Sequence, residues 1–330
     1  MSSEGATAVT IGNFDGVHLG HAALVRRCRE LAGGGPVRVL SFDPHPMTLL
    51  RPQSAPARLS GFEQREAWLR GLGADEVVRL TPDESLLNKS AREFVVWLVE
   101  RYRPRFVVEG DDFHFGKGRL GNNDTLRALG GELGFEVDVV PPVEVALGDD
   151  LIVRASSSIV RWLITQGRVA DAGRVLGRAY EVAGVVRQGD QRGRTIGYPT
   201  ANLSTEQLLP ADGVYAAYAV LPNARRYACA VNVGTRPTFE GVERRLEAYV
   251  LEAPASGLEG YNWRLRVQLV AWVREDLKFD DVPSLVRQIE RDCARVRDLL
   301  AVHERRTVVR PHSFLMCGMG SNNTPQGTTA

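Results

Sequence analysis

Short apolar runs alternate with amphipathic segments through the first half of the chain. Ala8–Phe14 reads as a strand, and in Gly16–Leu31 apolar residues recur at helical spacing until the glycines at 33–35 end the pattern. Buried runs between helices are typical of parallel strands, so the pattern predicts a doubly wound α/β domain with its ligand at the carboxyl ends of the strands. Further strands are expected at Val37–Phe42, Glu76–Leu80, Phe106–Glu109 and Val137–Val140, and further helices at Glu63–Leu72, Ala91–Tyr102, Ser157–Gln166 and Val169–Val175.

The pattern changes near Gly177–Ala179, after which strands are separated by turns rich in Gly, Pro and Asp. Such a series without intervening helices predicts an antiparallel barrel or sandwich. A closing helix is expected after Pro283, because the apolar residues that follow it share one face. The strands are expected at Tyr180–Val186, Val214–Leu221, Ala228–Val233, Leu246–Leu251 and Leu265–Val273.

These patterns divide the chain into residues 1–178, residues 179–302 and a tail of residues 303–330. The tail lacks periodicity and is rich in Gly, Ser, Asn and Thr, so Ser313–Ala330 is expected to be disordered. A length of 330 residues is enough for two domains of roughly 100–200 residues each.

Composition excludes several classes of protein but does not choose a function. The 41 basic and 40 acidic residues give a formal net charge of +1, so no nucleic-acid partner is expected. No apolar run approaches the roughly 20 residues that span a bilayer, and the N-terminus does not resemble a signal peptide. Four scattered cysteines without CxxC spacing argue against a zinc site and fit a cytoplasmic protein.

The first candidate site is the segment Gly12–His21, with the sequence GNFDGVHLGH, at a predicted strand-to-helix junction. His18 and His21 are three residues apart and would share one face of the helix start, where free N–H groups already favour an anion. Two imidazoles there would donate hydrogen bonds to phosphate oxygens. An isolated HxGH can also simply cap or pack, but its position after the first strand favours a functional role.

A second piece of this site is a serine run at residues 156–158, followed by Arg161. Such a run often only caps a helix, yet hydroxyls and an arginine fork can also hold phosphate. Taken together, HxGH and this segment resemble the HIGH-type and KMSKS-type signatures of class I synthetase-like folds and predict a nucleotidyltransferase site.

Two segments that follow predicted strands should reach the same crevice. In Phe42–Pro46, Asp43 and His45 are either metal ligands or parts of a rigid loop between prolines. In Gly110–Gly116, Asp112 would accept a hydrogen bond from a ring N–H, and Phe113 or Phe115 would either stack on a flat ligand or belong to the core.

A second candidate site lies in the predicted barrel. After the glycine-rich turn at residues 189–194, Thr200 and Asn202 point the same way from an extended segment and offer hard oxygen donors suited to Mg²⁺. No GxxxxGK[ST] P-loop occurs in this segment. Glu247 alternates with its neighbours in a strand, where it is either solvated or, if it faces a barrel interior with a nucleotide site, functional.

The chain resembles the bifunctional bacterial riboflavin kinase/FAD synthetase family from about Val9 to Leu300. The segments GNFDGVHLGH, FDPHP, GDDFHFGKGRLG, SSSIVR, GDQRGRTIGYPTANL, GVYAAYA and NVGTRPTFEG occur in the family's order. The resemblance implies a nucleotidyltransferase domain that transfers AMP from ATP to FMN, giving FAD and pyrophosphate. It also implies a barrel that phosphorylates riboflavin with ATP to give FMN, with Mg²⁺ as cofactor.

The resemblance also implies roles for individual residues. His18 and His21 would stabilise the α-phosphoryl group in transfer, and Glu247 would be the general base for the ribityl hydroxyl. The remaining roles follow the motifs: Gly12, Phe14 and Gly16 would shape the ATP pocket; Ser157, Ser158 and Arg161 would bind the triphosphate; Asp112 and Phe113 would bind the flavin; Thr200 and Asn202 would hold Mg²⁺ and ATP phosphates.

The sequence departs from the family pattern in three places. Ile159 stands where the Ser-Ser-Thr-Arg-Ile-Arg pattern has an arginine, the segment before the first strand is short, and Tyr261–Asn262 replaces a Tyr-Gly pair. The first departure bears on the ATP affinity of the adenylyl site, and one alternative is a kinase with a weakened adenylyltransferase domain. A second alternative, from another class, is a non-catalytic flavin- or RNA-binding regulator built on a degenerate enzyme. Intact HxGH and PTAN motifs together with Glu247 argue against the regulator.

Overall fold

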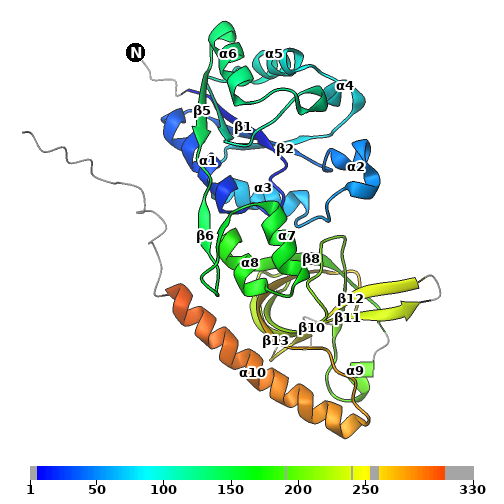
Figure 1. Cartoon of the computed structure of the whole chain (residues 1–330). Coiled ribbons are helices and arrows are strands. Elements are labelled where there is room, and N and C mark those ends of the chain that lie inside the picture. Colours follow the sequence, from blue (N-terminus) through cyan, green and yellow to red (C-terminus); the bar gives the residue numbers. More distant parts are fainter. Residues whose placement is uncertain (1–5, 190–191, 239–240, 253–259, 309–330) are drawn as a thin grey trace, which may run out of the picture.

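The structure is a computed structural model that describes residues 6–189, 192–238, 241–252 and 260–308. Figure 1 shows an α/β part that carries the N-terminus and a barrel along which the last helix runs. Among the described helices, none combines the length and the apolar character that a membrane span requires.

Five parallel strands form the sheet of the first part, in the order β3-β2-β1-β4-β5. Helices α1 and α3 bury apolar residues against one face, and α5 and α6 cover the other. This arrangement confirms the predicted doubly wound domain. The bounds are β1 Ala8–Gly12, α1 Leu19–Ala32, β2 Val37–Phe42, α2 Met47–Leu50, α3 Phe62–Gly71, β3 Glu76–Leu80, α4 Glu84–Leu87, α5 Ala91–Tyr102, β4 Phe106–Gly110, α6 Asn123–Leu133 and β5 Glu136–Val140, with short 3₁₀ turns at Pro52–Ser54 and Lys117–Arg119.

Strands β1 and β4 separate toward their carboxyl ends. They pair only at Ala8 and Val9 of β1, whereas β1 and β2 stay paired as far as Gly12. Beyond the β1–β4 pairs, the carboxyl group of Glu109 accepts the N–H of Ile11 at 2.8 Å in place of a backbone carbonyl. The strand order also reverses between these two strands, which is where a doubly wound sheet opens a crevice for its ligand.

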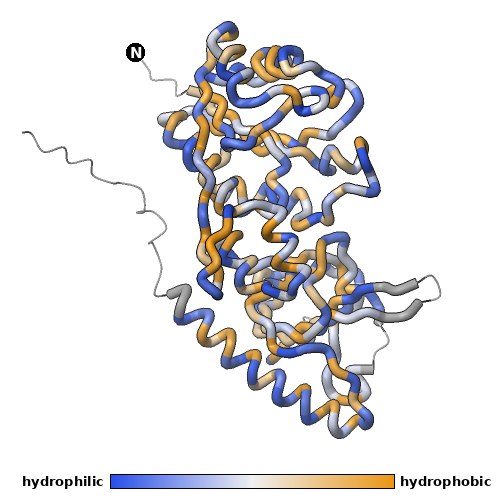
Figure 2. Tube along the Cα trace, in the orientation of Figure 1, coloured by the Kyte–Doolittle hydropathy of each residue, from blue (hydrophilic) through white to orange (hydrophobic). Residues whose placement is uncertain are grey.

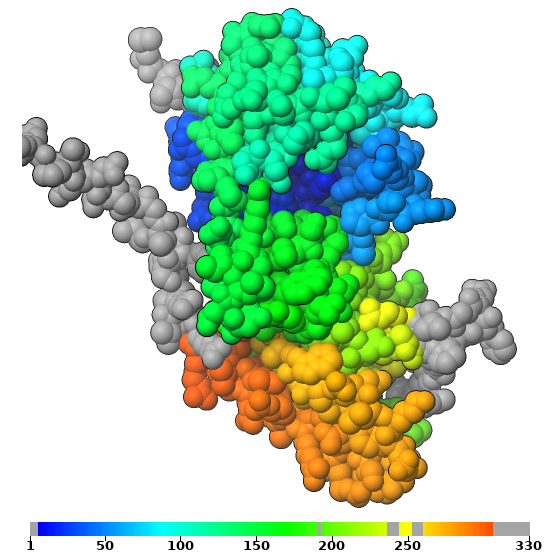
Figure 3. Space-filling view, in the orientation of Figure 1, coloured from blue at the N-terminus to red at the C-terminus, as the bar shows by residue number. Residues whose placement is uncertain are grey.

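A short hairpin and two helices connect the sheet to the barrel. The hairpin is β6 Glu144–Ala146 with β7 Ile152–Arg154, followed by α7 Ser157–Thr165 and α8 Val169–Leu176. Helices α7 and α8 bury Leu163 and Val175 in one cluster with the barrel interior. In the space-filling view of Figure 3, this green segment fills the space between the blue α/β part and the orange end of the chain.

The second part is a closed barrel in the strand order β10-β11-β12-β9-β8-β13, and all neighbouring strands are antiparallel. The expected barrel is therefore confirmed. One strand, β9, had been expected only as an extended segment. The bounds are β8 Tyr180–Arg187, α9 Arg192–Thr195, β9 Ala201–Ser204, β10 Gly213–Val220, β11 Arg226–Thr238, β12 Gly241–Val250 and β13 Arg264–Arg274.

The closing helix α10, Val282–Val308, packs Val296 and Leu300 on the outer face of the barrel. Figure 2 shows hydrophobic and hydrophilic residues alternating along it. The expectation of a tail from residue 303 is wrong for residues 303–308, which are helical. The hydroxyl of Tyr218 donates to Glu304 at 2.8 Å and ties this last part of the helix to β10. Residues 309–330, including the expected disordered segment Ser313–Ala330, lie outside the described residues.

Candidate active sites

The loop between β1 and α1 has an unusual backbone. Phe14, Gly16 and Val17 have φ values of 47°, 80° and 42°. These lie in the left-handed region that residues other than glycine rarely adopt. A Cβ atom at Gly16 would lie 3.0 Å from the Leu59 side chain, so both conformation and space favour glycine there. The loop delivers His18 to the N-cap position of α1, where its side chain makes no capping hydrogen bond.

The two histidines share one face, as their spacing predicts. Their ring centroids are 3.6 Å apart at an interplanar angle of 25°, and the Phe14 ring lies 4.9 Å from that of His21. Two glycines make room for these rings. An added Cβ would lie 3.0 Å from the His18 ring at Gly20 and 3.3 Å from the Phe14 ring at Gly12.

Both imidazoles are neutral at ordinary pH. Burial, followed by the charges of Arg178, Arg161 and Arg154, lowers the pKa of His18 to about 3. Burial and the neighbouring His18 likewise hold the pKa of His21 well below its usual value. Each ring therefore has one N–H donor and one lone pair. Among the described residues, nothing hydrogen-bonds to Nδ1 of either histidine.

Asp15 organises the segment that lies beside this loop. Its carboxylate accepts the N–H of Leu59 at 3.0 Å, and the N–H and hydroxyl of Ser60 at 3.0 Å each. The same carboxylate binds Nη2 of Arg161 at 2.6 Å, while Nε of Arg161 donates to the Ala57 carbonyl at 2.7 Å. Arg161 is thus brought to the histidine loop, as expected, in a fixed orientation.

The serine run divides into different roles. Ser156 is the N-cap of α7 and accepts the N–H of Ile159 at 3.2 Å, which is the structural role considered for this run. Ser157 donates to the backbone carbonyl of Asp15 at 2.7 Å and so lies at the loop. Ser158 is exposed on the first turn of the helix.

The expected flavin residues lie on the segment after β4. Asp112 is exposed and lies 3.3 Å from Nη2 of Arg154, whose charge also acts on His18. Phe113 is half-buried and stacks on the buried Phe115 with centroids 5.4 Å apart, so Phe115 belongs to the core. Sequence reasoning missed Arg154, which lies two residues before the serine run.

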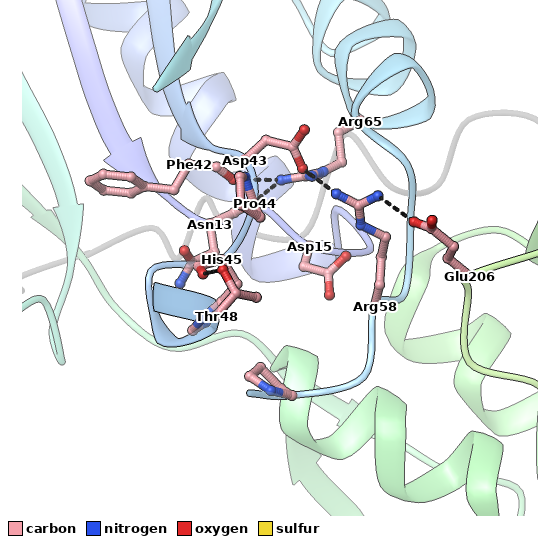
Figure 4. Close-up of a pocket in the computed structure, with 11 residues that line it drawn as sticks. Asn13, Asp15, Phe42, Asp43, Pro44, His45, Thr48, Arg58, Arg65 and Glu206 are labelled. Carbon is pink, nitrogen blue, oxygen red and sulfur yellow. Dashed lines mark hydrogen bonds and ion pairs between the residues drawn. The ribbon is translucent and has the colours of Figure 1, made fainter. Parts of the chain in front are cut away.

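A cavity of about 240 Å³ opens at the carboxyl ends of β1 and β2, as Figure 4 shows. The carboxylate of Asp43 binds the buried Arg65 and, at 2.6 Å, Arg58. Arg58 also reaches Glu206 of the barrel part at 3.4 Å, so residues from both parts of the chain line one cavity. The lining comprises Asn13, Asp15, Phe42, Asp43, Pro44, His45, Thr48, Pro56, Arg58, Arg65 and Glu206.

The geometry around the cavity favours the rigid loop over the metal site considered for Asp43 and His45. Asp43 is surrounded by arginines, including Arg79 at 3.5 Å, and Nδ1 of His45 accepts the N–H of Met47 at 3.1 Å. Within the described ranges, no group of three His, Cys, Asp or Glu side chains is placed to hold a metal ion.

The barrel residues expected to act together do lie together. Glu247 of β12 is paired directly with Asn202 of β9 on one side and with Asn232 of β11 on the other. Directly paired residues project from the same face of a sheet. The hydroxyl of Thr200 donates to Glu247 at 3.3 Å. Asn232 was not among the expected site residues.

Glu247 faces outward, so the interior location considered for it is wrong. Its neighbours Leu246 and Ala248 belong to the interior cluster, and alternate residues of a strand point to opposite faces. The site is therefore built on the outer wall of the barrel, the same surface that α10 covers over other strands.

Two oxygen atoms at this site lack a described partner. Oδ1 of Asn202 and Oδ1 of Asn232 are buried without a hydrogen-bond donor among the described residues. A Cβ at Gly189 would lie 2.1 Å from the Asn202 amide, so this loop can cover Asn202 only because it carries glycine there. Residues 190 and 191 of the expected glycine-rich turn lie outside the described residues.

Two family models match different parts of the chain. A model described as FAD synthetase matches residues 1–153, and one described as riboflavin kinase matches residues 176–300. The first match contains the histidine loop, and the second contains the outer-wall site.

Relatives resemble the chain over nearly its whole length. The bifunctional riboflavin kinase/FMN adenylyltransferase of Escherichia coli (strain K12) is 35% identical over 298 residues, covering 89% of this chain and 93% of that protein. A protein of the same description from Pseudomonas fluorescens is 37% identical over 297 residues, covering 88% and 92%. A solved structure described as a macrolide-efflux protein from Streptococcus pneumoniae has a TM-score of 0.79 at 30% identity, covering 89% of this chain and 94% of that one.

Proposed function

The chain belongs to the bifunctional riboflavin kinase/FMN adenylyltransferase family, and we propose that its two reactions occur at the two sites described above. It phosphorylates riboflavin with ATP to FMN, and it adenylylates FMN with ATP to FAD and pyrophosphate. The observation that carries the assignment of sites is the presence of two separate constellations. A stacked histidine pair lies at the start of a helix, and a cluster of side-chain oxygen atoms lies on the outer wall of the barrel.

In the adenylyl transfer, a phosphate oxygen of FMN attacks the α-phosphorus of ATP, and the bond from that phosphorus to the β-phosphate bridging oxygen breaks. Negative charge gathers on the α-phosphoryl oxygens as the transition state forms. The neutral His18 and His21 donate their N–H groups to those oxygens, beside the N-terminus of α1. Pyrophosphate leaves, and no covalent intermediate with the protein is needed.

Arg161, Ser157 and Ser158 bind the triphosphate in this proposal. Asp15 and the Ala57 carbonyl hold the Arg161 guanidinium by Nη2 and Nε, and the described residues give no partner to Nη1. Nη1 of Arg161 is therefore preorganised to donate to a phosphate oxygen. Gly12, Phe14 and Gly16 shape the ATP pocket, and Asp112 and Phe113 contact the flavin.

In the kinase reaction, Glu247 orients the ribityl hydroxyl and accepts its proton as the γ-phosphoryl group is transferred. The chemistry of the oxygen donors at Thr200 and Asn202 fits Mg²⁺, since Oδ1 of Asn202 is buried without a described partner. Bound there with ATP, Mg²⁺ would neutralise charge on the phosphates. Thr200 and Asn202 hold the phosphate side, while Glu247 serves the hydroxyl side.

The substrates are small molecules. We also propose that the enzyme is cytoplasmic and has no nucleic-acid partner. Cys28, Cys229 and Cys293 are buried free thiols, which supports a reducing compartment. The net charge of +1 gives no general attraction for nucleic acid.

The test of the proposed function is one incubation of the purified protein with riboflavin, ATP and Mg²⁺, followed by chromatography of the flavins. The proposal predicts FMN as an intermediate and FAD as the final product. Accumulation of FMN alone would favour a kinase whose adenylyl site is weakened, for which Ile159 is the motivating departure. Unchanged riboflavin would contradict both assignments.

A further inference from the structure

Arg178 connects the two parts of the molecule at the histidine loop. It lies between α8 and β8, within the residues matched by the riboflavin kinase model. Its guanidinium nevertheless reaches the loop between β1 and α1. Nη2 donates to the Gly16 carbonyl at 2.6 Å, and Nη1 donates to the Val17 carbonyl at 2.9 Å and to the Leu176 carbonyl at 3.2 Å.

The two loop carbonyls belong to the residues that immediately precede His18. Val17 has a φ of 42°, a costly conformation for a β-branched residue, which persists only when surrounding contacts hold it. The fork of Arg178 binds the carbonyls of Gly16 and Val17, on either side of the strained Val17 residue, and thus helps to fix where α1 begins. The orientation of the His18 side chain depends on where α1 begins, because His18 is the N-cap of this helix.

Arg178 is itself firmly placed. Its guanidinium lies over the Trp68 ring at 3.5 Å from the centroid, and Trp68 belongs to α3 of the first part. Burial lowers the pKa of Arg178 to about 10, so it remains a cation at neutral pH. The described residues give it backbone carbonyls and an aromatic ring as direct partners but no carboxylate.

We infer that Arg178 is a positioning residue for adenylyl transfer: from the segment between α8 and the first barrel strand, it holds the loop that aims His18 and His21. This inference rests on the proposed function. It means that adenylyl transfer depends on a side chain from the segment that links the two parts of the chain, inside the match to the riboflavin kinase model. The kinase site, on the outer wall at Glu247, shares none of these contacts.

The test compares Arg178→Met with Arg178→Lys in the full-length protein. Methionine keeps a long side chain against Trp68 but removes both donors to the loop. Because small displacements of catalytic groups can cost on the order of 10²-fold in rate, kcat for FMN adenylylation should fall by roughly 10–10²-fold. The KM for ATP should change much less, since Arg161 and the serines remain. Arg178→Lys keeps the charge but replaces the two-nitrogen fork with a single donor nitrogen, and should give an intermediate kcat.

Two comparisons show whether the effect is specific. Riboflavin phosphorylation by the same preparation should be unchanged, which also shows that the variant is folded. Arg264→Met removes another contact across the same junction, the exposed ion pair with Glu63 at 2.5 Å, and should leave both reactions unchanged.

A normal kcat for adenylylation by Arg178→Met would overturn the inference and leave the proposed function intact. A parallel loss of both reactions with a lower melting temperature would also overturn it, because Arg178 would then be structural. Failure of the unaltered protein to convert FMN to FAD would overturn the proposed function together with the inference.

Discussion

The imidazole rings of His18 and His21 are stacked with centroids 3.6 Å apart, and neither ring has a described partner at Nδ1. Two rings this close cannot both be imidazolium cations without strong repulsion, and burial already disfavours the charged form of each. The pair is therefore a set of neutral donors, fixed before a nucleotide arrives. In the proposed adenylyl transfer, this preorganisation would stabilise the charge that develops in the transition state.

Replacing one ring should remove adenylyl transfer selectively. His21→Ala is expected to lower the rate of FAD formation from FMN by on the order of 10²–10³, the typical cost of losing such a donor. His21→Gln retains an N–H donor and should lose less. Flavin chromatography at saturating ATP measures both variants, with riboflavin phosphorylation as the internal control. A normal rate of FAD formation in His21→Ala would remove His21 from the mechanism.

The histidine pair should make the protein less stable in mild acid. The pKa of His18 is about 3 in the folded protein and 6.5 in the unfolded chain, so the unfolded state takes up the proton first as the pH falls below 6.5. The free energy of unfolding should therefore decrease from pH 6.5 downward by up to about 1.4 kcal/mol per pH unit for each buried histidine. Urea unfolding of the double variant His18→Gln, His21→Gln between pH 7.5 and 5 should show a shallower slope. An unchanged slope would contradict the buried neutral pair.

Glu109 should have the opposite pH dependence. Burial between β1 and β4 raises its pKa well above the usual value, so the folded protein keeps this carboxyl protonated while the unfolded chain ionises it. Stability from this group is present below pH 4.5 and is lost as the pH rises toward the folded pKa.

Glu109→Gln stays neutral, and its amide oxygen can still accept the Ile11 N–H. Its free energy of unfolding should exceed that of the unaltered protein at pH 8, and the difference should shrink at pH 4.5. Glu136→Gln, which replaces an exposed glutamate of β5 that pairs with Arg105, is the control for the same substitution at the surface. Equal stability of Glu109→Gln and the unaltered protein across this range would contradict a protonated Glu109.

Magnesium removal should stop the kinase reaction, and the side chain of Asn202 should determine the Mg²⁺ concentration that the reaction requires. Chelation of divalent ions should abolish FMN formation. Asn202→Ala removes a buried amide oxygen and is expected to raise the Mg²⁺ concentration for half-maximal rate by roughly tenfold or more, as for the loss of one good interaction of about 1.4 kcal/mol. Asn223→Ala, in an exposed turn, is the control. A normal magnesium titration of Asn202→Ala would exclude Asn202 from the metal site.

Much of the fold follows from local patterns. The predicted strands Val37–Phe42 and Glu76–Leu80 have the observed bounds, because buried parallel strands are short apolar runs between clear breaks. The turn at Tyr261–Asn262 also follows: Asn262 has a φ of 67°, a conformation that asparagine tolerates in place of glycine. Helix α6 was missed because its glycines at 130 and 131 obscure the pattern.

The sites follow from sequence only in part. Alternation places Glu247 and Tyr249 on one face of a strand, but it does not say whether that face points into the barrel or out of it. Asn232 was missed because its relation to Glu247 exists only through strand pairing. Arg178 lies far from the histidines in sequence, and only tertiary contacts with the carbonyls before His18 bring it into the site.

Glu247→Gln, assayed for both reactions in one preparation, tests the central claim that two separate sites perform the two reactions. The variant keeps the size and polarity of the side chain but removes the base, so riboflavin phosphorylation should fall by roughly 10²–10⁴-fold. FAD formation from supplied FMN should be unchanged, since the histidine loop is built from other elements. A normal rate of riboflavin phosphorylation in the folded variant would contradict the role of Glu247, and a joint loss of both reactions would contradict the separation of the sites.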